Sequence, residues 1–106
     1  MAHTTPQLRA DAARLALEAI TSAQAAGRVA PTLRAIVAAL AADADFASAC
    51  PYPYKTESRY RWLNTLAYWQ LRRLLRQGLI VTVKGVGVRG RSVTAYQLAT
   101  INRGDN

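Results

Sequence analysis

The residues of this sequence best suited to chemistry are cations, and they gather in its second half. The chain holds 14 lysine and arginine residues against 6 aspartate and glutamate residues, a formal net charge of +8. Residues 1–54 contain four arginines and four acids, so the whole excess belongs to residues 55–106. A protein whose positive charge is concentrated in this way has the electrostatic pattern of a polyanion binder.

Arginine and lysine side chains can bind phosphate oxygens, and arginine can also bind the edge of guanine in a major groove. We therefore expect DNA contacts from the basic half of the chain. The candidate DNA-binding residues are Lys55, Arg59, Arg61, Thr65, Arg72, Arg73, Arg76, Lys84, Arg89 and Arg91. Arg89 and Arg91 lie in residues 85–91, GVGVRGR, which contain no acid, and a projecting arginine can enter a narrow minor groove.

Residues for catalysis or metal binding do not occur in a usable arrangement. The acids show no paired spacing, and residues 85–90 lack the lysine and the serine or threonine of a phosphate-binding loop. The single cysteine, Cys50, cannot form an internal disulfide, and His3 cannot build a zinc site with it. We therefore expect a protein that is not an enzyme and that uses no catalytic residue, metal or cofactor.

The sequence contains neither a signal peptide nor an apolar run long enough to span a membrane. The alanine-rich residues 36–49 are short and are interrupted by Asp43 and Asp45. These features predict a cytoplasmic protein without a membrane partner, associated with the nucleoid when it is bound to DNA.

Start and stop signals in the first half predict two helices. Thr5 and Pro6 mark the start of a helix and Gly27 marks its end, which places it at residues 6–26. Residues 28–30 precede a proline and predict a short strand, and a second helix follows at 31–42.

The second half predicts a loop, a long helix and a hairpin. Residues 46–55 hold two prolines and predict the loop. The long helix starts between Thr56 and Asn64 and ends before Gly78. Two strand-like runs, residues 79–84 and 92–98, predict hairpin arms joined by the flexible, cationic tip 85–91.

The long helix and the hairpin carry a pattern that resembles the winged helix-turn-helix superfamily over about residues 8–99. The matching residues are Ala67, Leu71 and Leu74, then Gly78-Leu79-Ile80, a basic loop and Tyr96-Gln97-Leu98. The resemblance implies an α+β, mainly α fold with three helices, a short strand and a C-terminal two-stranded wing hairpin. The length of the chain and its composition predict one domain over residues 1–106, with a core at about 6–99 and a polar tail at 100–106. The sequence departs from the pattern at residues 43–55, which separate the second and third helices.

A helical wheel divides the long helix into two faces. The face assigned to the core holds Tyr60, Leu63, Ala67, Leu71, Leu74 and Leu75. The opposite face holds Arg61, Trp62, Thr65, Leu66, Trp69, Arg72, Arg73 and Arg76. On that face we expect Trp62, Leu66 and Trp69 either to form a dimer or partner interface or to pack under the predicted loop at residues 46–55. We expect Arg72, Arg73 and Arg76 either to contact DNA or to form a solvated helix end.

These observations predict a protein that binds double-stranded DNA in a sequence-dependent way as a homodimer. Its role is that of a small transcription regulator or of a replication or partition factor. An alternative is a winged-helix interaction module whose aromatic and basic face binds an acidic protein partner. A third hypothesis is single-stranded nucleic acid stacked on Tyr52, Tyr54, Trp62 and Trp69.

Overall fold

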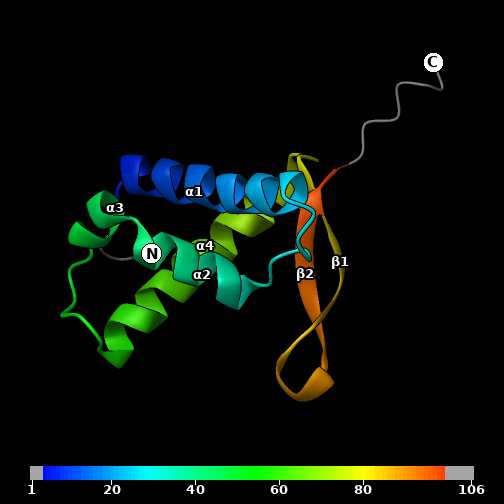
Figure 1. Cartoon of the computed structure of the whole chain (residues 1–106). Coiled ribbons are helices and arrows are strands. Elements are labelled where there is room, and N and C mark those ends of the chain that lie inside the picture. The colour runs from blue at the N-terminus through cyan, green and yellow to red at the C-terminus, as the bar shows by residue number, and fades with distance from the viewer. Residues whose placement is uncertain (1–3, 100–106) are drawn as a thin grey trace.

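The computed structural model describes residues 4–99, so the predicted polar tail at 100–106 and His3 lie outside the described residues. The elements in chain order are α1 (Pro6–Ala25), α2 (Leu33–Ala42), α3 (Ala44–Ser48), α4 (Glu57–Arg76), β1 (Ile80–Val86), a short turn of 3-10 helix (Val88–Gly90) and β2 (Ser92–Leu98). Figure 1 shows the helices on one side and the hairpin packed across their ends. This arrangement confirms an α+β, mainly helical fold with a two-stranded antiparallel hairpin at the C-terminal end.

Each of the four α-helices within the described residues begins after a polar residue whose side chain accepts a hydrogen bond from a backbone N–H in the first turn. These N-cap residues are Thr5, Thr32, Asp43 and Thr56. The cap at Thr56 places the start of α4 at Glu57, the early end of the range that the sequence leaves open. None of the helices within residues 4–99 is long and apolar enough to cross a membrane.

The prediction of a strand at residues 28–30 and of a helix beginning at Pro31 is wrong. Gly27 takes a positive φ of 69° and the Arg28 N–H donates to the Ala23 carbonyl (2.8 Å), so the chain after α1 forms the cap of that helix. The pairing of this connection with the hairpin is limited to one isolated bridge, between Thr32 and Ala95 in β2. Because Thr32 also caps α2, this helix starts at Leu33.

The prediction of a loop over all of residues 46–55 is also wrong, because its first residues belong to the short helix α3. The Asp43 carboxylate accepts a hydrogen bond from the Phe46 N–H (2.9 Å) and so starts this helix. Phe46 is buried, and its ring centroid lies 5.9 Å from that of Trp62 on α4. The contact provides an apolar anchor for α3.

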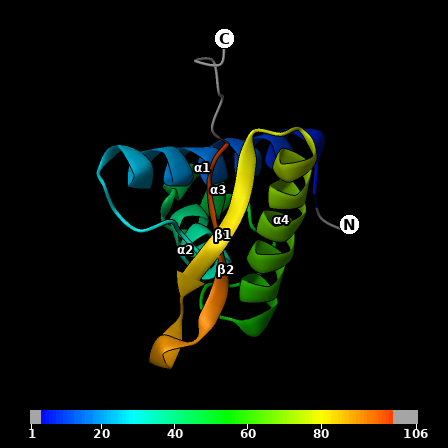
Figure 2. The same cartoon turned by 90° about the vertical axis from the view of Figure 1, so that its right-hand side faces the viewer.

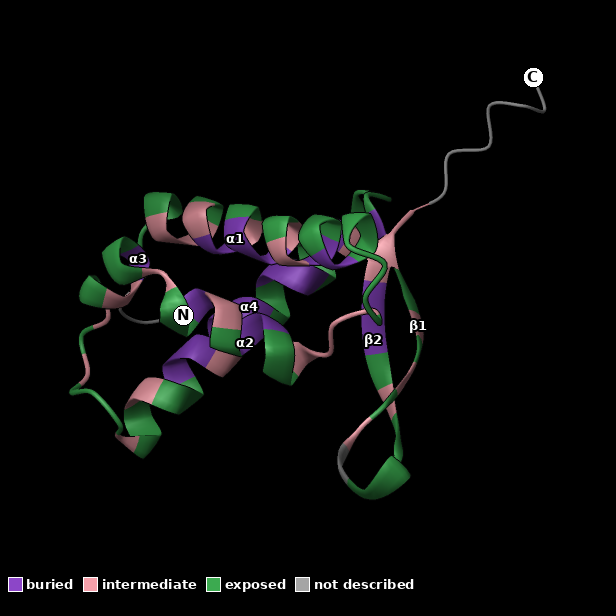
Figure 3. Ribbon diagram, viewed as in Figure 1, coloured by how far each residue is buried: buried purple, intermediate pink, exposed green. Residues whose placement is uncertain are grey.

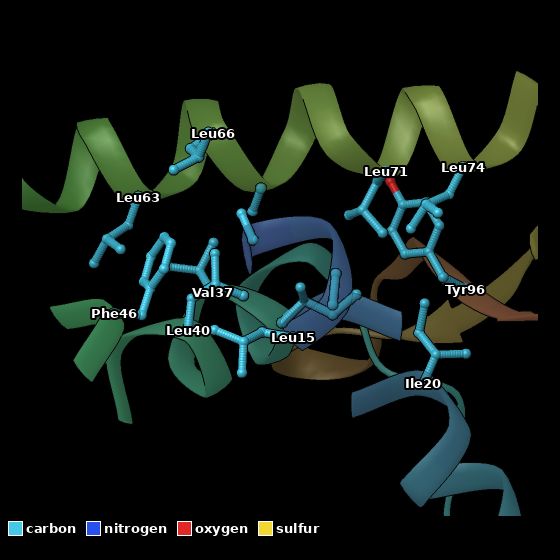
Figure 4. Packing of buried hydrophobic residues seen from close by; sticks show 14 of the residues in the cluster. Leu15, Ile20, Val37, Leu40, Phe46, Leu63, Leu66, Leu71, Leu74 and Tyr96 are labelled. Atoms are coloured by element: carbon cyan, nitrogen blue, oxygen red, sulfur yellow. The ribbon is translucent and has the colours of Figure 1, made fainter. Parts of the chain in front are cut away.

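The core forms where α4 packs against α1, α2 and the inner face of the hairpin. Figure 3 shows the buried residues on the sides of the helices that face one another. Figure 4 shows this packing around Leu15, Ile20, Val37, Leu40, Phe46, Leu63, Leu66, Leu71, Leu74 and Tyr96. Because two helices cover α4, its buried face is broad and includes Trp62 and Leu66, while Tyr60 is 53% exposed. The predicted core position of Tyr60 is therefore wrong.

The hairpin is longer and its tip shorter than the sequence predicts. The ladder runs from Ile80 opposite Leu98 to Val86 opposite Ser92, so only five residues turn the chain. At the tip the Gly87 N–H donates to the Arg91 carbonyl (2.7 Å). A Cβ atom on Gly85 would lie 2.9 Å from Cβ of Ala95, which explains why the strand continues through a glycine.

We expect Gly85→Ala to lower the free energy of unfolding by about 1–3 kcal/mol, because the strands must separate to admit the new methyl group. Urea denaturation followed by circular dichroism measures this loss. Ser92→Ala, at an exposed position of the same hairpin, is the control and should change the stability little. Equal stability of both variants would show that the close approach of the strands is not required.

Candidate nucleic-acid interface

A groove of about 840 Å³ lies between α4, the start of α2 and the outer half of the hairpin. Its lining residues are Thr32, Leu33, Arg34, Tyr60, Asn64, Tyr68, Val86, Gly87, Arg91, Val93, Thr94 and Tyr96. Figure 2 looks onto the hairpin and shows α4 beside it, with the start of α4 and the hairpin tip at the same end of the molecule. This geometry arises because β1 runs back antiparallel to α4 after the tight turn at Gly78.

The wall that α4 gives to this groove is a row of Tyr60, Asn64 and Tyr68. These residues are four positions apart, so they lie above one another on one side of the helix. Tyr60 and Tyr68 are 53% and 39% exposed, so both side chains are accessible to a ligand. The wall therefore offers aromatic faces together with hydrogen-bonding groups.

Two guanidinium groups line the groove, Arg34 from α2 and Arg91 from the hairpin. None of the described residues that line it is acidic. Lys84 pairs with Thr94 in the ladder but does not line this groove; it lines a neighbouring hollow between the hairpin, α1 and α2. The hairpin and α2 thus make one cationic wall opposite the tyrosines.

Sequence reasoning pointed to the amide of Asn64 as a candidate contact to phosphate or base, but it missed Arg34, Tyr60 and Tyr68 as site residues. The arginine lies in the neutral half of the chain, and nothing in its neighbours along the sequence marks it. Only the packing of α2 beside the hairpin, through the bridge from Thr32 to Ala95, brings it near Arg91. The four-residue spacing of the α4 row was a usable signal, but Tyr60 was assigned to the core.

Arg59, a predicted phosphate contact, already forms hydrogen bonds within the protein. Its guanidinium donates to the carbonyls of Tyr52 and Ala47, both at 3.3 Å, and is partly buried. It also lies 5.3 Å from the centroid of the Tyr54 ring. Arg59 therefore fastens the loop and α3 to the first turn of α4 and serves the fold.

The remaining candidates on α4 are spread along its length. Arg61 is exposed and pairs with Glu57 at 2.8 Å, a surface ion pair of little energetic weight. Thr65 is half-buried, and Arg72 lies over the Tyr68 ring, 6.0 Å from its centroid. Arg73 and Arg76 are exposed in the last turn, where cations favour the helix dipole. Because α4 ends where β1 begins, that turn lies at the base of the hairpin, far from the tip.

The predicted interface of Trp62, Leu66 and Trp69 does not form a common surface. Trp62 is 5% exposed and Leu66 is fully buried, so both belong to the core. Trp69 is 52% exposed and meets Tyr68 edge to face, with the ring centroids 5.6 Å apart. The burial of Trp62 also removes it from the stacking platform for single strands.

The Tyr96 phenol forms part of the groove floor and is 7% exposed. Burial raises the pKa of Tyr96, the nearby Tyr68 raises it further, and Arg72 lowers it. The neutral phenol is therefore favoured in the folded protein relative to the unfolded chain.

This pKa shift makes the folded state less stable as the pH becomes alkaline. Tyr96 favours folding below the pKa of an unfolded tyrosine, about 10, and this contribution is lost as the pH rises through the higher pKa of the folded state. We expect Tyr96→Phe to lose less stability than the wild type between neutral and strongly alkaline pH. Urea denaturation at a series of pH values measures both profiles, and parallel profiles would contradict the assignment.

Residues 4–99 contain no group of three or more histidine, cysteine, aspartate or glutamate residues placed to hold a metal ion. The chain matches no known protein family, no curated protein and no solved structure. Its fold and site define a small α+β domain with a cationic and aromatic groove between its longest helix and its terminal hairpin.

Proposed function

We propose that the protein binds double-stranded DNA, with α4 against the major groove and the hairpin acting as the wing of a winged-helix domain. The net charge of +8 supplies attraction to the phosphate backbone. The phosphates on either side of α4 are contacted by Arg34, Arg91 and Lys84. The side chain of Arg89 reaches from the hairpin tip into the neighbouring minor groove of the DNA. Asn64 and Thr65 supply hydrogen-bonding groups toward the bases. The protein acts by occupancy, as a small transcription regulator or a replication or partition factor.

The observation that carries this proposal is the backbone conformation of Lys55 and Arg89. Among the described residues other than glycine, these two alone have positive φ, 62° and 60°. Glycine adopts these angles at lower cost, by about 1 kcal/mol. Both residues are exposed cations, one directly before the cap of α4 and one at the hairpin tip. Strained backbone of this kind is typical of functional positions.

Replacement of each residue by glycine separates the charge from the fold. We expect Lys55→Gly and Arg89→Gly to keep or raise the free energy of unfolding, by up to about 1 kcal/mol, because the strain is relieved. We expect each to weaken binding to duplex DNA severalfold and to reduce its salt slope by about one. Arg14→Ala, which removes one exposed charge from α1, is the matched control. Duplex binding that is unchanged in both glycine variants would overturn this role.

A second candidate function, binding of an acidic protein partner, is favoured by the exposed aromatic pair Tyr68 and Trp69 beside Arg72. Exposed aromatic and arginine side chains are enriched at protein interfaces. Trp69→Ala distinguishes the two functions, because it removes an anchor for a protein but no cation. Loss of duplex binding in Trp69→Ala would mean that the aromatic pair belongs to the DNA interface.

A further inference from the structure

The hairpin has one edge that is occupied and one that is open. At the outer edge of β2, the Tyr96 N–H donates to the Pro31 carbonyl (3.0 Å), next to the bridge between Thr32 and Ala95. The outer edge of β1 has no strand partner within residues 4–99. Figure 1 shows β1 as the strand farther from the helices, and in Figure 2 it lies in front of them. A partner can therefore approach this edge without meeting the helices.

The hydrogen bonds at both ends of the hairpin identify the groups on the open edge. Gly87 is bonded to Arg91 at the tip, and Ala99 to Leu79 at the base, so odd-numbered residues from 79 to 87 pair with β2. The N–H and C=O groups of the even-numbered residues then point away from β2. These residues are Ile80, Thr82, Lys84 and Val86.

The open edge lacks the usual features that prevent pairing. β1 has no proline and only one charge, Lys84, and seven residues form one continuous ladder with β2. Apolar side chains are exposed along it, with Val81 at 38% and Val86 at 79%. Edge strands that stay unpaired normally carry several charges, prolines or bulges. This edge is therefore suited to accept another strand.

We propose that β1 pairs antiparallel with β1 of a second copy of this chain, so that the two hairpins form one four-stranded sheet. A two-fold axis at Val83 places Thr82 opposite Lys84 of the second copy and Ile80 opposite its Val86. This register pairs the outward N–H and C=O groups of all four even-numbered residues. It also prevents the two Lys84 side chains from lying directly opposite each other, because each faces a threonine.

The same register covers the exposed apolar side chains. Val81 and Val83 lie on one face of β1, where Val83 lies opposite Val83 of the second copy and Val81 lies opposite its Gly85 and diagonal to its Val83. The occupant is a second copy because the strand is its own complement about Val83 in length, in hydrogen-bonding groups and in the position of its charge. The two-fold axis runs perpendicular to the sheet, so both α4 helices lie on the same face of the four-stranded sheet.

Charge substitutions at Thr82 test both the pairing and its register. Thr82 is exposed, so its replacement leaves the core intact. We expect Thr82→Glu to strengthen dimerisation and Thr82→Lys to weaken it, each by about two- to thirtyfold, because two symmetric pairs with Lys84 change at once. Sedimentation velocity without DNA, over a wide range of protein concentrations, measures the dissociation constants. Dimerisation that is unchanged, or weakened by both variants, would overturn the proposal.

A backbone substitution provides an independent test. Thr82→Pro removes only an N–H that points away from β2, so the hairpin should persist while the dimer is lost. Thr82→Ala keeps that N–H and should dimerise like the wild type. Circular dichroism checks that each variant is folded, and the two charge variants decide the matter if the proline variant does not fold. A wild type that stays monomeric at every concentration would overturn the proposal.

The salt dependence of dimerisation and that of DNA binding should have opposite signs, so the two proposals can fail separately. Two copies of net charge +8 repel each other, so added salt should strengthen the dimer. Added salt should weaken binding to duplex DNA. Dimerisation that weakens as salt is added would show an interface held by ion pairs and would contradict the β1 edge.

Discussion

Replacement of both Arg34 and Arg91 by alanine is expected to lower the affinity for duplex DNA by about tenfold to a hundredfold at physiological salt, the loss for two direct contacts. Both guanidinium groups line the groove beside α4, and no acid lies among the lining residues to neutralise them. The magnitude of the salt slope should fall by about two, one for each lost phosphate contact. Fluorescence anisotropy of a labelled duplex, titrated at several salt concentrations, measures both quantities.

The matched control removes the same charge from another part of the molecule. Arg14 lies on the exposed face of α1, where it pairs with Glu18 at 3.0 Å. Arg28 lies in the connection after α1 and donates to Ser22. The double variant Arg14→Ala with Arg28→Ala should bind DNA nearly as the wild type does. An equal loss in both double variants would mean that affinity comes from net charge alone and that the groove has no special role.

The second large effect is expected in the core. Leu66→Ala should lower the free energy of unfolding by about 2–5 kcal/mol, because the side chain is fully buried between α4 and its neighbours and leaves a cavity. Trp69→Ala, one helical turn away and 52% exposed, should change it by about 1 kcal/mol or less. Urea denaturation measures the contrast between the two variants.

This contrast tests the assignment of Leu66 to the monomer core. If Leu66 belonged to a subunit interface, the stability loss in Leu66→Ala would grow as the protein concentration rises, because the wild type would be stabilised by association. We expect instead that the stability loss is the same at low and at high protein concentration, because the contacts lie within one chain.

Local signals in the sequence were sufficient for the first helix and for the hairpin. Thr5 and Pro6 fix the start of α1 by a cap that needs no tertiary contact, and the structure begins the helix at Pro6. The two β-branched runs around a glycine-rich centre form the expected antiparallel hairpin. The cap at Asp43 was an equally local signal for α3, but the prolines that follow it favoured a loop.

The sequence placed the centre of the buried face of α4 correctly, because Leu63, Ala67, Leu71 and Leu74 are buried as predicted, but it did not show how wide that face is. The alternation of apolar and basic residues along α4 fits more than one width, and the choice depends on where α1 and α2 lie. The structure covers α4 from two sides, which buries Trp62 and Leu66 and leaves Tyr60 in the groove. Arg59 shows the same limitation, because the carbonyls that it binds belong to a loop whose path the sequence does not specify.

The candidate site was predictable in its chemistry but only partly in its members. The excess of positive charge in residues 55–106 identified the polyanion as the partner to expect, and Arg91 was among the expected residues. The presence of Arg34 and Arg91 in the same groove could not be predicted without the tertiary fold, because one comes from the start of α2 and the other from the hairpin.

The central claim is that this domain binds double-stranded DNA, and the most direct test is the affinity of the wild-type protein for duplex DNA of random sequence. Fluorescence anisotropy at several salt concentrations measures it, with single-stranded DNA and an acidic polypeptide as competitors. We expect the duplex to be preferred over both competitors, with a logarithmic affinity that falls linearly as the logarithm of the salt concentration rises. Duplex binding no tighter than binding to the acidic polypeptide would contradict the claim and would leave the exposed aromatic pair on α4 as a site for a protein partner.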